Sequence, residues 1–353
     1  MVYIRAFKMK AAVFSKPGIE NLRVQEYPEP EIGDHDVLIK VKMAGVNPID
    51  YFTVSGTRGL KGQALPIKVE PLPHIPGSEI TGTVDRFGKH VERFTKGDRV
   101  IAYNRLFDGT CDMCLNSCEM LCRSKIVEGL IGVNTNGGFA EYVSVPEKNL
   151  FIVPNNLEWE LAASIPITAL TPFHALKEAS LRANESLLVF GASGNTGMLA
   201  IQLGKKIGAY VVAISGKKWL KDFGADYVIA DPEKISSDVD RITGGKLADV
   251  VLNALGNDMW EKSFKVLGSK GRLITFGVLT GNEVKVDVHA LYSKHIRIIG
   301  CTGGSRSELQ ELIGFSKQLR IKVWKKFKLE EAKEALRGLF APRREGRILL
   351  EIG

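Results

Sequence analysis

Three glycines, Gly191, Gly194 and Gly197, lie between a short apolar run and a helix-like stretch of the chain. At such a strand-to-helix turn, glycines permit the tight turn, the close approach of a pyrophosphate and the packing of helix against strand. Backbone N–H groups at the start of the helix then hold the phosphates. The spacing is GxxGxxG, and its place between strand and helix predicts a dinucleotide-binding loop. The residues predicted to contact the cofactor here are Gly191, Ser193, Gly194, Asn195, Thr196 and Gly197.

The end of the next apolar run, Val211–Ile214, carries a second signal for a cofactor. Folds that bind NAD commonly place an acidic residue at this point, about 20 residues after the glycines, where it binds the ribose 2′-hydroxyl. This chain has Ser215, Lys217 and Lys218 instead, which offer hydrogen-bond donors and positive charge. Because a 2′-phosphate requires such groups, the sequence favours NADPH over NADH. The alternative is a solvated, basic start of a helix.

Four of the five cysteines lie in one short segment, at Cys111, Cys114, Cys118 and Cys122. Four thiolates in one loop can enclose a tetrahedral structural zinc. Reduced thiols without metal and disulfide bonds are the two alternatives. The fifth cysteine, Cys301, is isolated and is interpreted as part of the core or of the cofactor-binding wall.

Two kinds of element must position these residues. As far as about residue 155, short strands alternate with Gly, Pro and Asp, and the period-two pattern of Val37–Met43 indicates a half-buried strand. After Pro154, short apolar runs alternate with helix-like stretches, which is typical of a parallel sheet covered on both faces. These segments are 161–179, 187–190, 197–207, 211–214, 250–252, 258–267 and 273–276. From about Cys301, a helix at 329–339 and a last strand at 348–352 predict a β-rich domain split around a doubly wound insert.

The composition excludes several classes of protein. The chain has 353 residues, of which 44% are hydrophobic and 25% charged, so it is not disordered as a whole and is long enough for two domains. No apolar run approaches the roughly 20 residues that span a bilayer, and no secretory signal is recognisable at the start. Five cysteines are few, so we expect a cytoplasmic protein.

The net charge of +8 favours anionic ligands, but it does not separate nucleic acid from a phosphorylated cofactor. The basic stretch Leu319–Lys328 interleaves aromatic residues with lysines, as nucleic-acid patches do. We interpret it as a strand with one apolar and one solvated face. The expected partner is therefore a small-molecule substrate, with neither nucleic acid nor membrane.

Several motifs occur in the order in which one known family carries them. They are MKAAVFSKPG from Met9, GVNPID from Gly45, PGSEITGTV from Pro76, GDRV from Gly97, GGFAEYVSVP from Gly137 and GASGNTG from Gly191. This order resembles the medium-chain dehydrogenase/reductase superfamily over essentially all of residues 9–352. The resemblance implies nicotinamide-dependent hydride transfer and assembly as a homodimer or homotetramer.

The same resemblance implies an α/β fold class with two domains. A GroES-like β-barrel catalytic domain is expected at residues 1–167, with a return to it at 303–353. A Rossmann domain with a doubly wound parallel sheet is expected at residues 168–302. The family places its active site in the cleft between two such domains.

The alcohol dehydrogenases of this family hold a catalytic zinc on three residues, and the matching positions here are Asn47, Ser78 and Ile167. Isoleucine cannot ligate a metal, and asparagine and serine are poor zinc ligands. No catalytic zinc is therefore expected, and Ser78 and Glu79 are interpreted as remnants of a ligand motif. Asn47 in the cysteine place resembles quinone oxidoreductases and enone reductases of the zeta-crystallin type, which transfer hydride without metal. The cysteine segment matches the lobe that holds a structural zinc, although the usual family spacing there is C-x2-C-x2-C-x7-C.

Reduction of an enone by hydride leaves an enolate oxygen that a donor must stabilise. Tyr51 is the first candidate donor, although the tyrosine of related reductases corresponds to Phe52. Asn47 is a candidate to bind a substrate carbonyl or the nicotinamide ribose. The alternatives are that Tyr51 is pocket wall and Asn47 a turn former. Further cofactor contacts implied by the resemblance, with strand-end packing as the alternative, are Ala254, Leu255, Phe276, Gly277, Val278, Cys301 and Arg347.

The sequence thus predicts an NADPH-dependent oxidoreductase that transfers hydride to a quinone, an enone or a related carbonyl compound without a catalytic zinc. Two alternatives stay open at this point. One is an NADP-dependent enzyme of the alcohol dehydrogenase type, and the other is an NADPH-binding protein without turnover.

Overall fold

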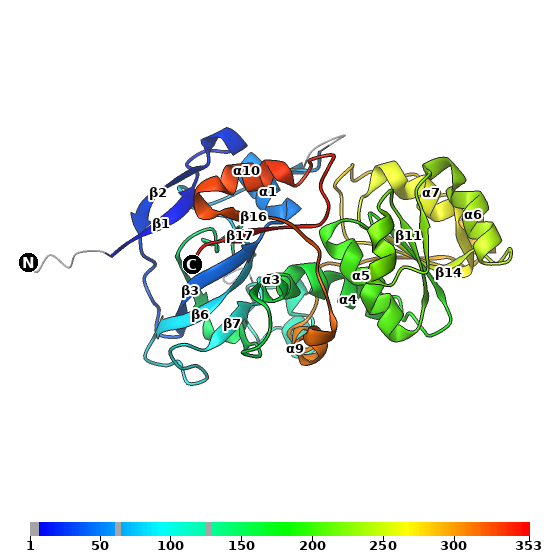
Figure 1. The fold of residues 1–353 in the computed structure, drawn as a ribbon. Coiled ribbons are helices and arrows are strands. Elements are labelled where there is room, and N and C mark those ends of the chain that lie inside the picture. Colours follow the sequence, from blue (N-terminus) through cyan, green and yellow to red (C-terminus); the bar gives the residue numbers. More distant parts are fainter. Residues whose placement is uncertain (1–6, 61–64, 125–128) are drawn as a thin grey trace, which may run out of the picture. The chain divides into compact units, whose positions relative to one another are not determined.

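The computed structural model describes residues 7–60, 65–124 and 129–353, which fall into two compact units (Figure 1). The first unit comprises Met1–Thr57, Pro66–Ile167 and Ser305–Gly353. The second unit comprises Arg58–Leu65 and Thr168–Gly304. Within the described ranges, no helix has the length and apolar character needed to cross a membrane.

A mixed sheet of seven strands forms the frame of the first unit. Its strand order is β16-β17-β3-β6-β7-β9, and β8 pairs with β3. Neighbouring strands are antiparallel, except β16 and β17, which are parallel. The bounds are β3 (Asp36–Gly45), β6 (Glu79–Phe87), β7 (Arg99–Ala102), β8 (Tyr142–Pro146), β9 (Leu150–Ile152), β16 (Val323–Lys328) and β17 (Arg347–Glu351). A second, antiparallel sheet pairs β1 (Lys8–Val13) with β2 (Arg23–Pro28), and two-residue strands are β4 (Thr57–Arg58) and β5 (Leu65–Pro66).

The core of the first unit follows the alternation of its strands. Val37, Ile39 and Val41 of β3 are fully buried in one apolar cluster, as the period-two pattern predicts. Leu38, on the opposite side of the strand, is buried as well, so this strand is covered on both faces over part of its length.

Helix α1 (Pro48–Ser55) follows β3 and carries Tyr51, with Asn47 directly before its first residue. Asn47 occupies its N-cap, and the Asp50 carboxylate accepts a hydrogen bond from the backbone N–H of Asn47 at 2.8 Å. The sequence Asn-Pro-x-Asp therefore determines where this helix begins, through a capping box and a proline at the first turn. Gly56, with φ 80°, ends the helix in the left-handed region. The other helices of this unit are α2 (Asp112–Leu115), α3 (Trp159–Ala162), α9 (Arg306–Phe315) and α10 (Ala332–Gly338).

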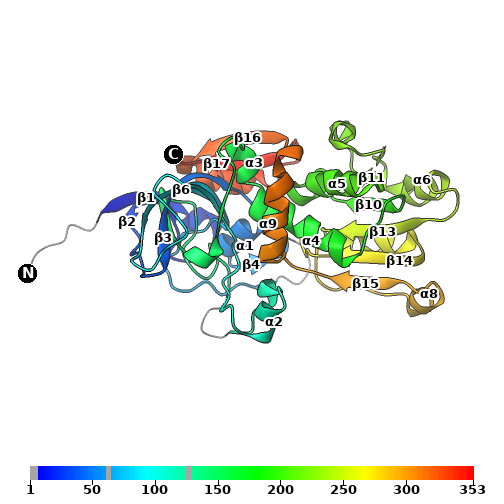
Figure 2. The same ribbon diagram turned by 90° about the horizontal axis from the view of Figure 1, so that it is seen from below.

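The second unit is a parallel sheet of six strands in the order β12-β11-β10-β13-β14-β15, with β15 at one edge (Figure 2). Counted along the chain, this is the order 3-2-1-4-5-6 of a Rossmann sheet, which confirms the predicted doubly wound fold. The five residues of β10 are all buried, as in a sheet covered on both faces. The strands are β10 (Ser186–Phe190), β11 (Tyr210–Ile214), β12 (Tyr227–Ile229), β13 (Ala248–Asn253), β14 (Leu267–Thr275) and β15 (Arg297–Gly300). The helices are α4 (Leu170–Glu178), α5 (Asn195–Ile207), α6 (Ile235–Ile242), α7 (Trp260–Lys265) and α8 (Val288–Ser293).

The segment 161–179, expected as a helix interrupted by Pro166 and Pro172, is in three pieces. Helix α3 ends at Ala162, a π-helical turn covers Ile165–Ala169, and α4 begins at Leu170. Pro166 lies inside the π-helical turn, where a missing N–H and a bulky ring prevent regular α-helix. The division between the two units, after Ile167, falls in this turn.

Candidate functional site

The glycine loop joins β10 to α5 with the backbone form that a phosphate site requires. Gly191 has φ 71°, a conformation that favours glycine. A Cβ atom on Gly197 would lie 2.7 Å from the Cα atom of Ala192, so only glycine lets the helix approach the turn so closely. Gly194 is the N-cap of α5, and Asn195 starts the helix, so the first N–H groups of α5 follow directly. The loop therefore fits a dinucleotide phosphate group.

Other predicted cofactor residues follow the carboxyl ends of parallel strands in the second unit, which is where doubly wound sheets bind ligands. A Cβ atom on Gly277 would lie 3.1 Å from the carbonyl carbon of Ala254, so the segments after β13 and β14 pass close to each other. Leu255 lies against the glycine loop, 3.0 Å from a Cβ atom built on Gly191. Phe276 and Val278 flank Gly277, and Cys301 follows β15. Their contact with a cofactor stays a prediction.

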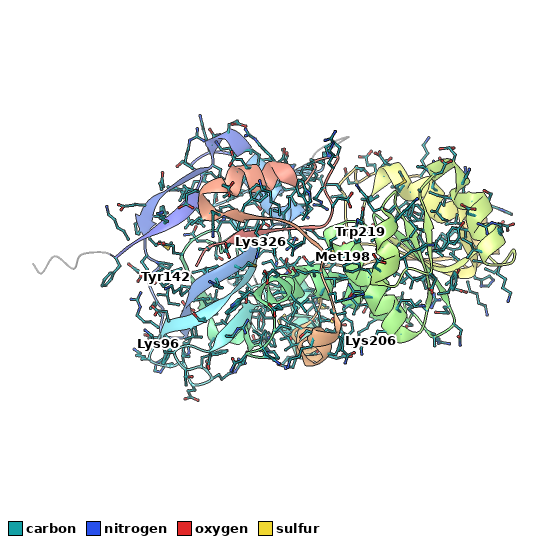
Figure 3. The ribbon with its side chains drawn as sticks, in the orientation of Figure 1. Lys96, Tyr142, Met198, Lys206, Trp219 and Lys326 are labelled. Carbon is teal, nitrogen blue, oxygen red and sulfur yellow. The ribbon has the colours of Figure 1, made fainter. Side chains whose placement is uncertain are left out.

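The end of β11 carries basic rather than acidic side chains. The Ser215 hydroxyl accepts a hydrogen bond from the Lys217 backbone N–H at 3.3 Å, and Lys218 is exposed at the start of a 3-10 turn. Trp219, labelled in Figure 3, follows in the same turn. The centroid of its ring lies 5.3 Å from that of Phe223. This segment presents a hydroxyl and two ammonium groups where NAD-binding folds commonly present a carboxylate.

A buried ion pair lies at the centre of the polar residues of the first unit. The Arg347 guanidinium, at the start of β17, pairs with the Glu79 carboxylate, at the start of β6, and neither side chain has exposed surface. Arg347 also donates to the backbone carbonyl of Val46 and, at 3.4 Å, to Ser164 Oγ. A side chain at Gly45 would overlap with Arg347 Nη2, so glycine there leaves room for the pair. Two charges without water are tolerated only when paired and hydrogen-bonded in this way.

The three positions that correspond to zinc ligands in the family lie around this pair. Asn47 donates from Nδ2 to Glu79 Oε2 at 2.9 Å, and its Oδ1 accepts from Arg347 Nη1 at 3.0 Å. The backbone N–H of Ile167 donates to Glu79 Oε1 at 2.8 Å. Ser78 precedes Glu79 in the chain. Both oxygens of the Glu79 carboxylate are therefore occupied inside the first unit, which makes this residue more than a remnant of a ligand motif.

A second buried carboxylate, that of Asp50, joins the same segments. One oxygen accepts from the Asn47 backbone N–H and the other from the Ser78 backbone N–H, each at 2.8 Å. Burial raises the pKa of Asp50 to about 6, against the opposing effects of these hydrogen bonds and of Arg347. The carboxyl group therefore holds positions 47 and 78 together.

This set of groups does not fit a catalytic zinc. Such a site needs three ligands among cysteine, histidine and carboxylate side chains, with an open fourth position. Here the positions hold an amide bound at both ends, a hydroxyl and an aliphatic side chain, and the nearby Glu79 carboxylate is neutralised by Arg347. Of the residues that the structure describes, the one group of three or more metal-ligating side chains lies in the cysteine segment instead.

Three of the predicted site residues take positions that the sequence did not specify. Asn47 orients its amide between Glu79 and Arg347, and its contact with substrate or ribose stays a prediction. Arg347 is fully buried in the first unit, and its contact with a pyrophosphate also stays a prediction. Tyr51 is partly buried, with its ring 4.9 Å from that of Phe340.

Four side chains of the cysteine loop, which we define as residues 108–122, form a candidate metal centre. The ligand atoms of Asp108, Cys111, Cys114 and Cys122 all lie within 4.8 Å of one another. The Cys111 sulfur lies 3.6 Å from that of Cys114 and 4.0 Å from that of Cys122. Zinc–sulfur bonds of about 2.3 Å in a tetrahedron place sulfurs about 3.8 Å apart, so the group fits zinc. A bound zinc would link the two arms of the loop, which are the segment from Asp108 to Cys114 and the segment that ends at Cys122.

Three of the four predicted cysteines lie in this group, and metal binding by any of them stays a prediction. Cys118 lies outside the group, and its Sγ contacts the carbonyl oxygen of Asn116 at 3.5 Å. Asp108 takes the fourth place, which makes the spacing D-x2-C-x2-C-x7-C, the family spacing with aspartate in the first position. When the family spacing is counted back from Cys122, its first position falls on Asp108. This count is the sequence signal that could have found Asp108. All five cysteines are free thiols.

Electrostatics distinguish the members of this group. Backbone N–H groups of Cys111 and Thr110 hold the pKa of Asp108 well below its usual range. The backbone N–H of Arg123 lowers the pKa of Cys111, whereas burial raises the pKa of Cys114 to about 12. The loop projects with α2 from the sheet of the first unit (Figure 2).

A doubly wound unit with a glycine loop, joined in one chain to a split β-rich unit, defines a class of nicotinamide-dependent oxidoreductases. Residues 33–155 match the family model of the alcohol dehydrogenase GroES-like domain, and residues 196–318 match that of the zinc-binding dehydrogenase. The chain belongs to the medium-chain dehydrogenase/reductase superfamily, which confirms the resemblance of its motifs. It is an oxidoreductase of that family.

Relatives of two kinds are similar to this chain. The NAD-dependent alcohol dehydrogenase of Sulfolobus acidocaldarius is 30% identical over 352 residues, which cover 98% of this chain and 100% of that protein. A human quinone oxidoreductase is 28% identical over 308 residues, which cover 85% of this chain and 82% of that protein. The cobalt- and zinc-bound structure of a thermostable alcohol dehydrogenase from Pyrobaculum aerophilum has a TM-score of 0.88 and 38% identity, covering 98% of this chain and 100% of that one. The similarity to these alcohol dehydrogenases exceeds that to the quinone oxidoreductase.

Proposed function

We propose that this chain is an NADPH-dependent reductase of quinones, enones or related carbonyl compounds that transfers hydride without a catalytic zinc. The observation that carries the proposal is the closed network around Glu79. Its carboxylate binds Arg347, Asn47 and Ile167, and so occupies the space and the charge that a metal with its ligands would need.

The segment after β11 supports the choice of cofactor. Ser215, Lys217 and Lys218 supply donors and positive charge, and the first acidic residue after the strand is Asp222. A ribose 2′-phosphate gains charge-assisted hydrogen bonds from such groups. The 2′-hydroxyl of NADH, by contrast, lacks the carboxylate that commonly accepts its hydrogen bond. The nicotinamide supplies the hydride when the cofactor is bound.

The reduction leaves a negative oxygen on the substrate, and the first unit offers Tyr51 as its hydrogen-bond donor. The Tyr51 ring is held by Phe340 on one side, which orients the phenol without using its hydroxyl. Asn47, Asp50 and Glu79 act behind it, because their hydrogen bonds determine where the start of α1 lies. These residues position the helix that carries Tyr51.

A second candidate is oxidation of alcohols with NADP, which is the same hydride transfer in reverse. It is favoured by the relatives that are named alcohol dehydrogenases. The catalytic positions argue against it, because a metal normally polarises the alcohol oxygen in such enzymes and none fits here. An NADPH-binding protein without turnover is the third candidate.

The test combines a cofactor titration with a substrate panel. NADPH should bind at least about tenfold more tightly than NADH, by fluorescence titration, because each charge-assisted hydrogen bond is worth about 1.5–3 kcal/mol before desolvation. NADPH oxidation should occur with quinones or enones and should survive gentle chelation. Equal or tighter binding of NADH contradicts the cofactor assignment, and a fast, reversible loss of rate on chelation with unchanged circular dichroism contradicts the metal-free mechanism. Binding without oxidation across the panel favours the third candidate.

We further propose a homodimer or homotetramer located in the cytoplasm, with a small-molecule substrate as its main partner. The family resemblance supports the assembly, and light scattering coupled to size exclusion measures it directly.

A further inference from the structure

Arg306, the first residue of α9, contacts Glu119 of the cysteine loop and Phe107, the residue that directly precedes the loop. Its backbone N–H donates to Glu119 Oε2 at 3.3 Å. Its guanidinium carbon lies 5.3 Å from the centroid of the Phe107 ring and 5.4 Å from that of Phe151. Glu119, Phe107 and Phe151 are all buried, so these contacts are largely shielded from water. A cation over two aromatic rings gains more where it is desolvated.

Two of these contacts, those with Phe107 and Glu119, lie close in the chain to ligands of the candidate metal centre. Phe107 directly precedes Asp108 in the chain. Glu119 starts a 3-10 turn in which the Cys122 backbone N–H donates to the Glu119 carbonyl at 3.0 Å. A bound metal would therefore link the same two segments, around Asp108 and around Cys122, that Arg306 contacts from α9.

Glu119 also completes the N-terminus of α9. Ser305 and Glu308 form a capping box, which satisfies the N–H groups of those two residues. The N–H of Arg306 has no partner within the helix, because the first N–H groups of an α-helix never do. The Glu119 carboxylate accepts it and adds a negative charge near the positive end of the helix dipole.

We propose that metal binding by the cysteine loop and the packing of α9 against that loop are coupled through Arg306 and Glu119. When the metal centre is empty, the segments around Asp108 and Cys122 separate, which moves the Phe107 ring away from the Arg306 guanidinium and the Glu119 carboxylate away from the start of α9. Conversely, loss of the α9 contacts leaves the arms less well placed for the metal. By thermodynamic linkage, zinc binding favours the contact of α9 with Glu119 and Phe107 by some factor, and that contact tightens zinc binding by the same factor.

The first experiment measures amide hydrogen exchange in the full chain, with and without Zn²⁺. After chelation, exchange at residues 306–309 should accelerate by about tenfold, a factor in the usual range for coupled sites. Helix α10, which lies in the same unit and packs against β17 and α1, serves as the internal reference. A uniform acceleration over the first unit, or none at 306–309, overturns the proposal.

The second experiment measures Zn²⁺ affinity by competition with a chelator. Arg306→Met keeps the apolar stem and removes the charge, and Glu119→Gln keeps an acceptor and removes the charge at the helix end. Each should weaken Zn²⁺ binding by a factor similar to the change in exchange, while Arg306→Lys retains part of it. The matched control is Arg241→Met, because Arg241 lies 5.4 Å from the Tyr227 ring in the second unit.

Unchanged Zn²⁺ affinity in both Arg306→Met and Glu119→Gln overturns the coupling, as does an equal loss in Arg241→Met. A wild-type chain that binds no Zn²⁺ overturns it as well. If Arg306→Met does not fold, Glu119→Gln alone decides the outcome, because it changes one atom type and keeps the shape of the side chain.

Discussion

The buried pair of Glu79 and Arg347 is the feature whose removal should cost the first unit most. In Arg347→Met the side chain keeps its apolar length, but the Glu79 carboxylate is left charged and without exposed surface. It retains the hydrogen bonds from Asn47 and from the backbone of Ile167. Removing one member of a buried pair costs about 3–5 kcal/mol, because the other charge stays desolvated.

This magnitude is large enough for a simple melting experiment. A domain of roughly 200 residues loses about 2–4 °C of Tm per kcal/mol, so Arg347→Met should lower the Tm of the first unit by about 6–20 °C. Glu79→Gln should cost a comparable amount, because a buried guanidinium cannot lose its proton. The double variant Glu79→Gln with Arg347→Met should be much less destabilised than the sum of the single variants, since neither charge remains.

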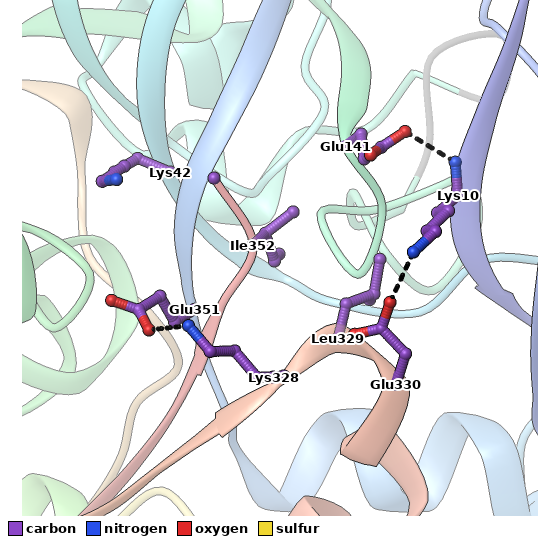
Figure 4. A pocket seen from close by; sticks show the side chains of 9 residues that line it. Lys10, Lys42, Glu141, Lys328, Leu329, Glu330, Glu351 and Ile352 are labelled. Carbon is purple, nitrogen blue, oxygen red and sulfur yellow. Dashed lines mark hydrogen bonds and ion pairs between the residues drawn. The ribbon is translucent and has the colours of Figure 1, made fainter.

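The control is an ion pair between neighbouring strands of the same unit that differs chiefly in exposure. Lys328 and Glu351 pair at the surface, where both line the pocket drawn in Figure 4, with side chains 66% and 33% exposed. Exposed pairs contribute about 0–1 kcal/mol, so Lys328→Met should change the Tm by no more than a few degrees. Additive losses in the Glu79–Arg347 cycle, or a loss no larger than that of Lys328→Met, would refute the assignment of this pair as a coupled, desolvated one.

Three further predictions concern the cofactor, the metal and pH. Lys217→Ala and Lys218→Ala should each weaken NADPH binding by about tenfold or more and leave NADH unchanged, as measured by fluorescence titration; equal losses for both cofactors would contradict a 2′-phosphate contact. Elemental analysis should find at most one zinc per chain, and this zinc should be lost in Cys114→Ser and kept in Cys118→Ser. Chelation should lower the stability of the fold before it lowers turnover. Because burial raises the pKa of Asp50 from 3.8 to about 6, the folded chain holds a proton there that the unfolded chain releases. The contribution of protonated Asp50 to the free energy of unfolding is therefore complete below pH 4 and falls by about 3 kcal/mol as the pH rises through 6. Urea unfolding at pH values from 4 to 8 measures this change. The difference between wild type and Asp50→Asn should show this slope, and a flat difference would contradict the raised pKa.

The cysteine loop shows how residue type can single out a segment without identifying each member of a side-chain group. Metal-ligating residue types in one short segment predicted a candidate site, and three of the four cysteines lie in the group that the folded loop forms. Cys118 and Asp108 could not be told apart by residue type alone, since the more common ligand lies at the wrong place in the turn. The folded loop decides between them, because α2 and the following 3-10 turn direct the Cys118 sulfur toward Asn116.

What the sequence determined by itself depends on neighbours a few residues apart. The glycine loop, the basic end of β11 and the capping box at Asn47 are local, so residue type and spacing specify them. The alternation of apolar runs and helices likewise specifies the doubly wound sheet, because each strand must be buried on both faces. Only the tertiary structure decided that Glu79 and Arg347 form a pair. They lie 268 positions apart, and two of the groups that complete their network are backbone atoms of Val46 and Ile167, whose hydrogen bonds leave no mark in residue type. A backbone N–H or carbonyl is present at almost every position, so only the folded chain shows which ones a buried charge will use.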